Sequence, residues 1–121
     1  FSASLDASGT VTGYRLRGAG INSGNSTRED NFPSGAIPNV LIESVEHKSA
    51  ITTGAWRAPI TNFLAFAEQA FLDEVAEAAK QDPIKFRLGL LNRAKVNPVG
   101  AIKYDIDRMR TVIELAEEKS G

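Results

Sequence analysis

One pair of residues, Asp82-Pro83, limits the fold more than any other. Proline inside an α-helix removes a backbone hydrogen bond and clashes with the preceding turn, so no helix can run through Pro83. Aspartate at the N-cap followed by proline at the first helical position is instead a strong start signal. The pair therefore predicts a helix beginning at Asp82, with Ile84, Leu88 and Leu91 on its apolar face.

Two further helices are predicted around this one. Before it, a helix is expected from Thr61 to Lys80, because apolar residues recur there at three- and four-residue spacing: Phe63, Ala67, Ala70, Phe71 and Ala78. Thr61 or Asn62 is its expected N-cap. After an Asn97-Pro98 break, a third helix is expected over residues 105–119, with an apolar stripe of Ile106, Met109, Ile113 and Ala116.

The first half of the chain has the pattern of strands and loops. Residues 3–6 and 10–17 flank a turn at Gly9 and predict a β-hairpin. Residues 19–39 predict a long loop, and residues 40–51 predict one strand or two short ones. The expected fold is therefore α+β: a single domain over residues 1–121 in which a small antiparallel sheet packs with about three C-terminal helices.

Composition excludes several classes of function. The 121 residues suffice for one hydrophobic core, and the formal net charge of −1 does not favour binding to nucleic acid. No apolar run approaches the roughly 20 residues needed to cross a bilayer, so membrane insertion is not expected. The chain contains no cysteine and one histidine, so this chain by itself is expected to hold no metal and no Fe–S cluster.

Trp56 and Arg57 form the first candidate site, between the last predicted strand and the first predicted helix. An arginine there can bind an anion through two hydrogen bonds, and the following helix N-terminus adds N–H donors. The alternative interpretation is a surface arginine beside a core tryptophan.

Glu74 and Arg87 form the second candidate site. Glu74 projects from the middle of the predicted apolar face of the first helix, where a carboxylate must be paired, hydrogen-bonded or neutral. Arg87 lies at the edge of the apolar stripe of the second helix. We therefore expect a structural ion pair between Glu74 and Arg87.

Several short sequence motifs follow one another in the second half of the chain. They are Thr-Gly-Ala-Trp-Arg at 53–57, Ala-Phe-Ala at 65–67, Phe-Leu-Asp-Glu-Val-Ala at 71–76, and Asp-Pro-Ile-Lys-Phe-Arg-Leu at 82–88 with leucines at 90 and 91. This order and spacing resemble the molybdopterin-binding subunits of the xanthine dehydrogenase and aldehyde oxidase family. The tryptophan before Arg57 is most like the isoquinoline 1-oxidoreductase β-subunit group.

The resemblance implies that the chain is an internal fragment of a larger oxidoreductase subunit. The parent enzyme would hydroxylate N-heteroaromatic or aldehyde substrates with oxygen from water, using molybdenum held by molybdopterin. Its partners would be the remainder of the molybdenum-binding subunit and an Fe–S subunit or domain, in the cytoplasm or the periplasm. Arg57 and Trp56 would lie near the cofactor, whereas Glu74 and Arg87 would support the scaffold.

The chain also departs from the family pattern. Gln69 stands where the family usually has glutamate, and Ala58-Pro59-Ile60 replaces a more usual Ser-Val-Gly. The family's catalytic glutamate and most of its pterin-binding segments have no counterpart here, so the fragment is expected to contain no catalytic residue, to bind no cofactor alone and to be inactive. The competing hypothesis is a free-standing interaction or ligand-binding module. An excised piece should expose an apolar patch, through which copies of the chain can associate.

Overall fold

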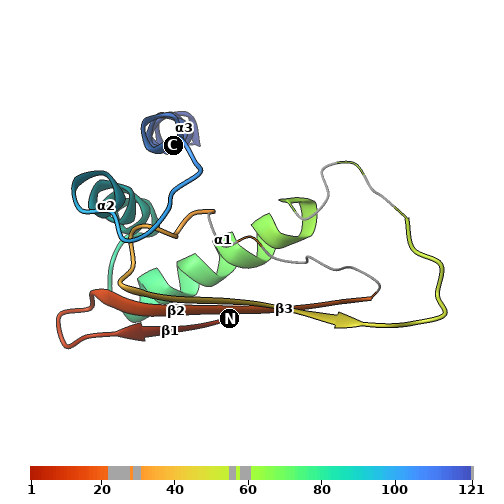
Figure 1. Cartoon of the computed structure of the whole chain (residues 1–121). Helices are drawn as coiled ribbons and strands as arrows, with labels where there is room; N and C mark the ends of the chain where they lie inside the picture. Colours follow the sequence, from red (N-terminus) through yellow and green to blue (C-terminus); the bar gives the residue numbers. More distant parts are fainter. Residues whose placement is uncertain (22–27, 29–30, 55–56, 58–60, 121) are drawn as a thin grey trace.

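The computed structural model describes residues 1–21, 28, 31–54, 57 and 61–120, with side chains in the first helix from Leu64 onward. Its elements are β1 (Ser2–Leu5), β2 (Val11–Ile21), β3 (Asn39–His47), α1 (Thr61–Ala78), α2 (Pro83–Val96) and α3 (Ile106–Ser120). The predicted α+β class is confirmed. Figure 1 shows a three-stranded sheet with α1 along one face, α2 stacked at one end of that face and α3 outermost.

The predicted N-terminal hairpin is present, and its turn is organised by Asp6. One carboxylate oxygen of Asp6 accepts hydrogen bonds from the backbone N–H groups of Ser8 at 2.8 Å and Thr10 at 3.0 Å. The Ser8 hydroxyl donates to the same oxygen at 2.6 Å, and this bond is the largest cause lowering the pKa of Asp6. An aspartate that bonds the backbone two residues ahead is a common way to close a turn.

The third strand corrects the predicted sheet. β2 pairs with β1 in the antiparallel sense, but β3 runs parallel to β2, from Gly13 opposite Asn39 to Ile21 opposite His47. The sheet is therefore mixed and not wholly antiparallel. A parallel partner requires a connection that returns to the same end of the sheet. Residues 22–38 make that connection, and its stretch from Phe32 to Ile37 is buried.

The core lies between the sheet and the helices. β2 contributes Val11, Tyr14 and Leu16 to it, each no more than 3% exposed. The helices contribute an opposing set of buried apolar side chains: Leu64, Leu72, Val75 and Ala76 from α1, and Phe86, Leu90, Leu91 and Ala94 from α2. Only Leu91 of the stripe predicted for α2 is fully buried, because α2 is rotated so that Phe86 and Leu90 face the sheet as well.

The buried connection before β3 passes close to the segment between α2 and α3. The carbonyl of Gly35 accepts a hydrogen bond from the Val99 N–H at 3.0 Å, and the Tyr104 hydroxyl donates to the Ser34 carbonyl at 2.6 Å. Gly35 has φ +81°, and a Cβ on it would overlap the side chain of Ile102. Glycine is therefore required there both by the backbone conformation and by the close packing.

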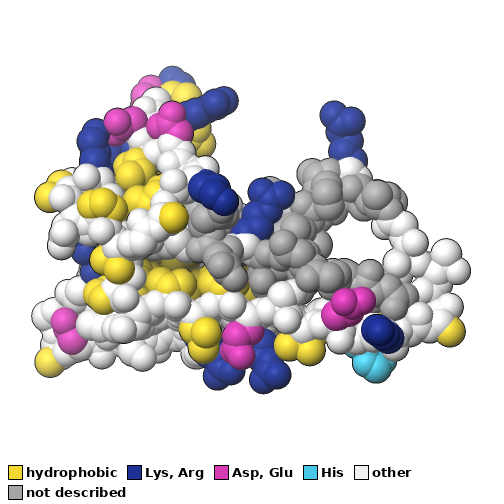
Figure 2. All heavy atoms as spheres, in the orientation of Figure 1, with side chains coloured by type: hydrophobic (Ala, Val, Ile, Leu, Met, Phe, Trp, Pro, Cys, Tyr) yellow, Lys and Arg dark blue, Asp and Glu magenta, His cyan; other side chains and the backbone are white. Residues whose placement is uncertain are grey.

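α3 is attached more loosely than the other helices. None of its residues is buried, and it packs through the half-buried Ile106, Met109 and Ile113, while the predicted stripe residue Ala116 is exposed. Lys95 of α2 forms an ion pair with Asp107 of α3 at 2.5 Å. Figure 2 shows apolar side chains open at the surface around α2 and α3. The exposed apolar residues also include Phe66 of α1, which is 81% exposed.

Candidate functional site

The predicted cofactor-proximal pair lies between β3 and α1. Arg57 is exposed, and no hydrogen bond or ion pair joins it to another residue in the part of the chain that the structure describes. The first turn of α1, which follows it, contains no acidic residue. Trp56 lies outside the described residues. The structure thus leaves Arg57 as an exposed cation in front of a helix N-terminus.

The apolar stripe of α1 is shifted along the chain by one position relative to the predicted stripe. Its buried positions are Leu64, Glu68, Leu72, Val75 and Ala76, which follow helical spacing. Glu74 is exposed and lies on the side of the helix toward β1, beside Ala3 and Leu5. A shift of one residue turns a helix by about 100°, so the acid buried against the core is Glu68 and not Glu74.

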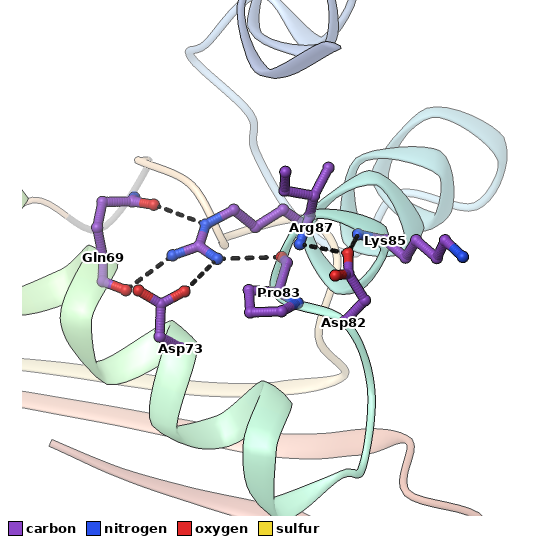
Figure 3. A network of polar contacts seen from close by, with 7 residues as sticks. Gln69, Asp73, Asp82, Pro83, Lys85 and Arg87 are labelled. Carbon is purple, nitrogen blue, oxygen red and sulfur yellow. Dashed lines mark hydrogen bonds and ion pairs between the residues drawn. The ribbon is translucent and has the colours of Figure 1, made fainter. Parts of the chain in front are cut away.

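Arg87 ties α2 to α1 through its guanidinium group (Figure 3). Its Nε donates to Gln69 Oε1 at 3.0 Å, and its Nη2 donates to the Gln69 carbonyl at 2.8 Å. Its Nη1 donates to an Asp73 carboxylate oxygen at 2.7 Å and to the Pro83 carbonyl at 3.0 Å. Arg87, Gln69, Asp73 and Pro83 are called the Arg87 clamp below. Every guanidinium nitrogen has an acceptor, which offsets the cost of burying this charge.

The predicted ion pair between Glu74 and Arg87 is therefore wrong in its acidic partner. Asp73, the residue before Glu74, makes the ion pair instead. The reason is again the rotation of α1, which turns Asp73 and Gln69 toward α2 and carries Glu74 away from it. Gln69, which stands where the resembled family usually has glutamate, is the residue whose side-chain oxygen meets Arg87 Nε.

The start of α2 brings Pro83 to the clamp. As predicted, Asp82 is the N-cap, and its side chain accepts hydrogen bonds from Ile84 N at 3.0 Å and Lys85 N at 2.9 Å (Figure 3). Pro83 occupies the first turn, where its missing N–H costs no hydrogen bond. Its carbonyl accepts from Arg87 one turn later, so the helix start and the contact between the two helices share one group.

Glu68 was not singled out from the sequence, yet it is the one charged residue among the described residues that is buried. It is 6% exposed, and no hydrogen bond or ion pair joins its carboxyl to any residue in the described ranges. Burial without a counter-charge raises its pKa from 4.5 to about 7. The signal that could have identified it is the row of leucine, valine and alanine at 64, 72, 75 and 76, which surrounds position 68 on the helix.

Tyr14 is a second buried polar group near Glu68. Its hydroxyl oxygen is inaccessible to solvent and has no hydrogen-bond partner among the described residues, while its ring packs against Phe1 and Phe71. Burial, and then the charge on Glu68, raises the pKa of Tyr14. The interior thus holds a tyrosine hydroxyl and a carboxyl that influence each other electrostatically, without a described cation to neutralise the carboxylate.

A cavity of about 210 Å³ opens beside Glu68. Phe32 from the buried connection, Leu64 from α1, and Tyr104 and Met109 from the α3 region form its apolar wall. The rings of Phe32 and Tyr104 pack edge to face, with centroids 5.8 Å apart. A carboxyl with a pKa near neutrality in such a cavity can exchange a proton or bind a cation, and groups of this kind often mark functional sites.

The described residues do not bring together three acidic or histidine side chains in a way that could hold a metal ion. Nor is any helix among them both long enough and apolar enough to cross a bilayer. Comparisons with protein-family models, with curated proteins and with solved structures found no match. The two observations that bear on function are thus the clamp, which joins two of the sequence motifs, and the Glu68 cavity.

Proposed function

We propose that this chain is part of the molybdopterin-binding subunit of a molybdenum hydroxylase, in the xanthine dehydrogenase and aldehyde oxidase family. The observation that carries the proposal is the Arg87 clamp. It joins the Asp-Pro-Ile-Lys-Phe-Arg motif of α2 to the segment of α1 that the resemblance also includes, through Gln69 and Asp73. Two motifs whose residues share one hydrogen-bond network depend on each other, which supports treating them as parts of one family pattern.

In this proposal the helices α1 and α2 are a scaffold, and Arg57 is the residue of this chain nearest to the cofactor. An exposed arginine without an acidic partner in the described part of the chain suits an anionic pterin cofactor, which is consistent with the position of Arg57. The molybdenum cofactor would supply the hydroxylation chemistry when bound. The contribution of this chain would be to place one cation beside it and to hold that junction against the helical scaffold.

Turnover would depend on residues outside this chain. The resemblance includes neither the family's catalytic glutamate nor most of its pterin-binding segments. A large cofactor held through a small share of its contacts would not repay the entropy lost on binding. We therefore expect the chain alone to bind no molybdopterin and to show no hydroxylase activity.

The first test is the reading frame of the gene that encodes this chain. The proposal expects the frame to continue on both sides into pterin-binding segments and, downstream, into a segment with the catalytic glutamate. A frame that begins and ends near these residues would overturn it. The competing hypothesis, a free-standing interaction or ligand-binding module, would then apply.

The second test uses the full-length subunit purified with its partner. Arg57→Ala should lower the molybdenum and pterin content, measured by metal analysis and by fluorescence of the oxidised pterin. Arg17→Ala is the matched control, because Arg17 is also an exposed arginine but lies on β2, away from the junction before α1. Equal cofactor content in both variants would contradict the placement of Arg57 near the cofactor.

A further inference from the structure

The cavity beside Glu68 combines two features that rarely occur together without a ligand. Glu68 is 6% exposed, and its carboxyl has no hydrogen-bond or ion-pair partner among the described residues. The same residue lines an open space of about 210 Å³. A buried carboxylate is costly unless a positive group or several donors meet it.

We propose that this cavity is a binding site for an organic cation of the guanidinium, amidinium or ammonium class, carried on an apolar body. Glu68 would form the ion pair, and the apolar wall would receive the body of the ligand. The inference is independent of the hydroxylase proposal, because it rests only on Glu68 and the residues around the cavity.

The walls of the cavity select among positively charged ligands. Phe32, Tyr104 and Met109 present aromatic and thioether surfaces beside the carboxyl. Aromatic faces attract organic cations, whereas Ca²⁺ and Mg²⁺ require several oxygen ligands. Glu68 is the only carboxylate lining this cavity among the described residues; Asn31 and Gln69 also line it, but the Gln69 side-chain oxygen already accepts a hydrogen bond from Arg87. The site therefore favours a delocalised or alkylated cation over a metal ion.

The guanidinium group of Arg87, which contacts the residue next to Glu68, is not available to Glu68. Arg87 binds Gln69, the residue after Glu68, but all three of its nitrogens are engaged in the Arg87 clamp. Glu68 is therefore adjacent in sequence to a residue that binds Arg87, but it makes no hydrogen bond or ion pair with Arg87 itself. A cation for Glu68 has to come from another source, either a small molecule or an arginine or lysine side chain from another polypeptide segment.

The experiment compares a cation with its neutral analogue. Benzamidine and benzamide are titrated into the isotopically labelled chain, and amide chemical shifts are followed by NMR. Benzamidine is expected to shift resonances around Leu64, Tyr104 and Met109, and benzamide is expected to bind at least about tenfold more weakly. Equal affinities for benzamidine and benzamide would overturn the proposal.

Two variants locate the binding to Glu68. Glu68→Gln keeps the shape of the side chain and removes its charge, so the affinity for benzamidine should fall by about tenfold or more. Glu74→Gln is the matched control, because Glu74 is an exposed acid on the same helix and does not line this cavity. The proposal is also wrong if both variants bind benzamidine as the unmodified chain does.

A measurement on the unmodified chain keeps the proposal testable if Glu68→Gln misfolds. The ionisation of Glu68 is followed through its carboxyl carbon by NMR, with and without benzamidine. A bound cation favours the charged form, so the pKa of Glu68 should fall when benzamidine is present. An unchanged titration would argue against an ion pair at this carboxyl.

The source of the cation is distinguished by a second pair of ligands. N-acetyl-arginine methylamide and N-acetyl-lysine methylamide represent side chains presented by a polypeptide. Tighter binding of either one than of benzamidine would assign the site to a basic side chain, and the reverse would assign it to a small molecule. Failure of all three cations to bind would overturn the site.

Discussion

Gln69 and Glu68 are neighbours in α1, and they differ in whether the charge buried beside them has hydrogen-bond partners. Gln69 accepts hydrogen bonds from the guanidinium group of Arg87, and each nitrogen of that group has an acceptor. Glu68 brings its own charge into the interior and meets no described partner. Little of either group is exposed: 11% of the Arg87 side chain and 6% of the whole residue Glu68.

The comparison separates a structural role from a binding role. A satisfied buried charge holds two helices at one orientation, because moving either helix would leave several hydrogen bonds unmade. An unsatisfied buried charge lowers stability and is tolerated where something else compensates for it. We therefore interpret the Arg87 clamp as scaffold and the Glu68 cavity as a place for a ligand.

The largest expected effect comes from breaking the clamp. Arg87→Ala should lower the free energy of unfolding by about 3 kcal/mol, because it removes the hydrogen bonds to Gln69, Asp73 and Pro83, although Asp73, whose side chain is 56% exposed, regains water. Urea denaturation followed by circular dichroism measures the change. Lys85→Ala, at an exposed position of the same helix, is the control. A loss below about 1 kcal/mol for Arg87→Ala would contradict the role of Arg87 in holding α2 against α1.

The second effect is the dependence of stability on pH. Because burial raises the pKa of Glu68 from 4.5 to about 7, the folded chain binds this proton more tightly than the unfolded chain. The free energy of unfolding from this group should be highest below about pH 4.5 and fall by about 3 kcal/mol as the pH rises through about 7. Denaturation from about pH 5 to about pH 8 measures this fall.

The variants in this pH series test the origin of the slope. Glu68→Gln should remove it and should be more stable than the unmodified chain at about pH 8, whereas the exposed Glu74→Gln should retain it. If the slope persists in Glu68→Gln, its source is another group, and the contrast between Glu68 and the clamp would be lost.

A smaller effect is expected from the two buried tyrosine hydroxyls. Tyr14→Phe removes a hydroxyl without a partner and should leave stability unchanged or raise it by up to about 1 kcal/mol. Tyr104→Phe removes the hydrogen bond to the Ser34 carbonyl and should lower stability by about 1 kcal/mol. Thermal denaturation compares the pair. Equal losses for both would indicate that the Tyr14 hydroxyl is also satisfied.

The smallest effect is expected from placing glutamate at position 69, where the resembled family usually has it. Gln69→Glu places a charged acceptor opposite Arg87 but also a second carboxylate near Asp73, so the net gain should be about 0.5 kcal/mol. The gain should vanish when Arg87 is replaced by methionine, which a double-mutant cycle measures. A gain that survives without Arg87 would show that Gln69→Glu acts outside the clamp.

The starts of the elements could be predicted from the sequence, but the rotation of the helices could not. The Asp82-Pro83 start and the hairpin around Gly9 follow from bonds between residues a few positions apart. In α1, two rows of apolar residues lie about 100° apart, and Phe66, although apolar, is 81% exposed. Periodicity alone does not separate the two rows and therefore predicts Glu74, and not Glu68, in the core.

The sequence by itself determined the local features of this protein: the α+β class, the turn at Asp6, the cap at Asp82 and the order of motifs along the chain. Only the tertiary structure decided that β3 runs parallel to β2, that Asp73 is the acid paired with Arg87 and that Glu68 is buried beside a cavity. The physical reason is the range of the interactions. Caps and turns are closed by nearby backbone groups, whereas strand direction and burial depend on contacts between segments far apart in the chain.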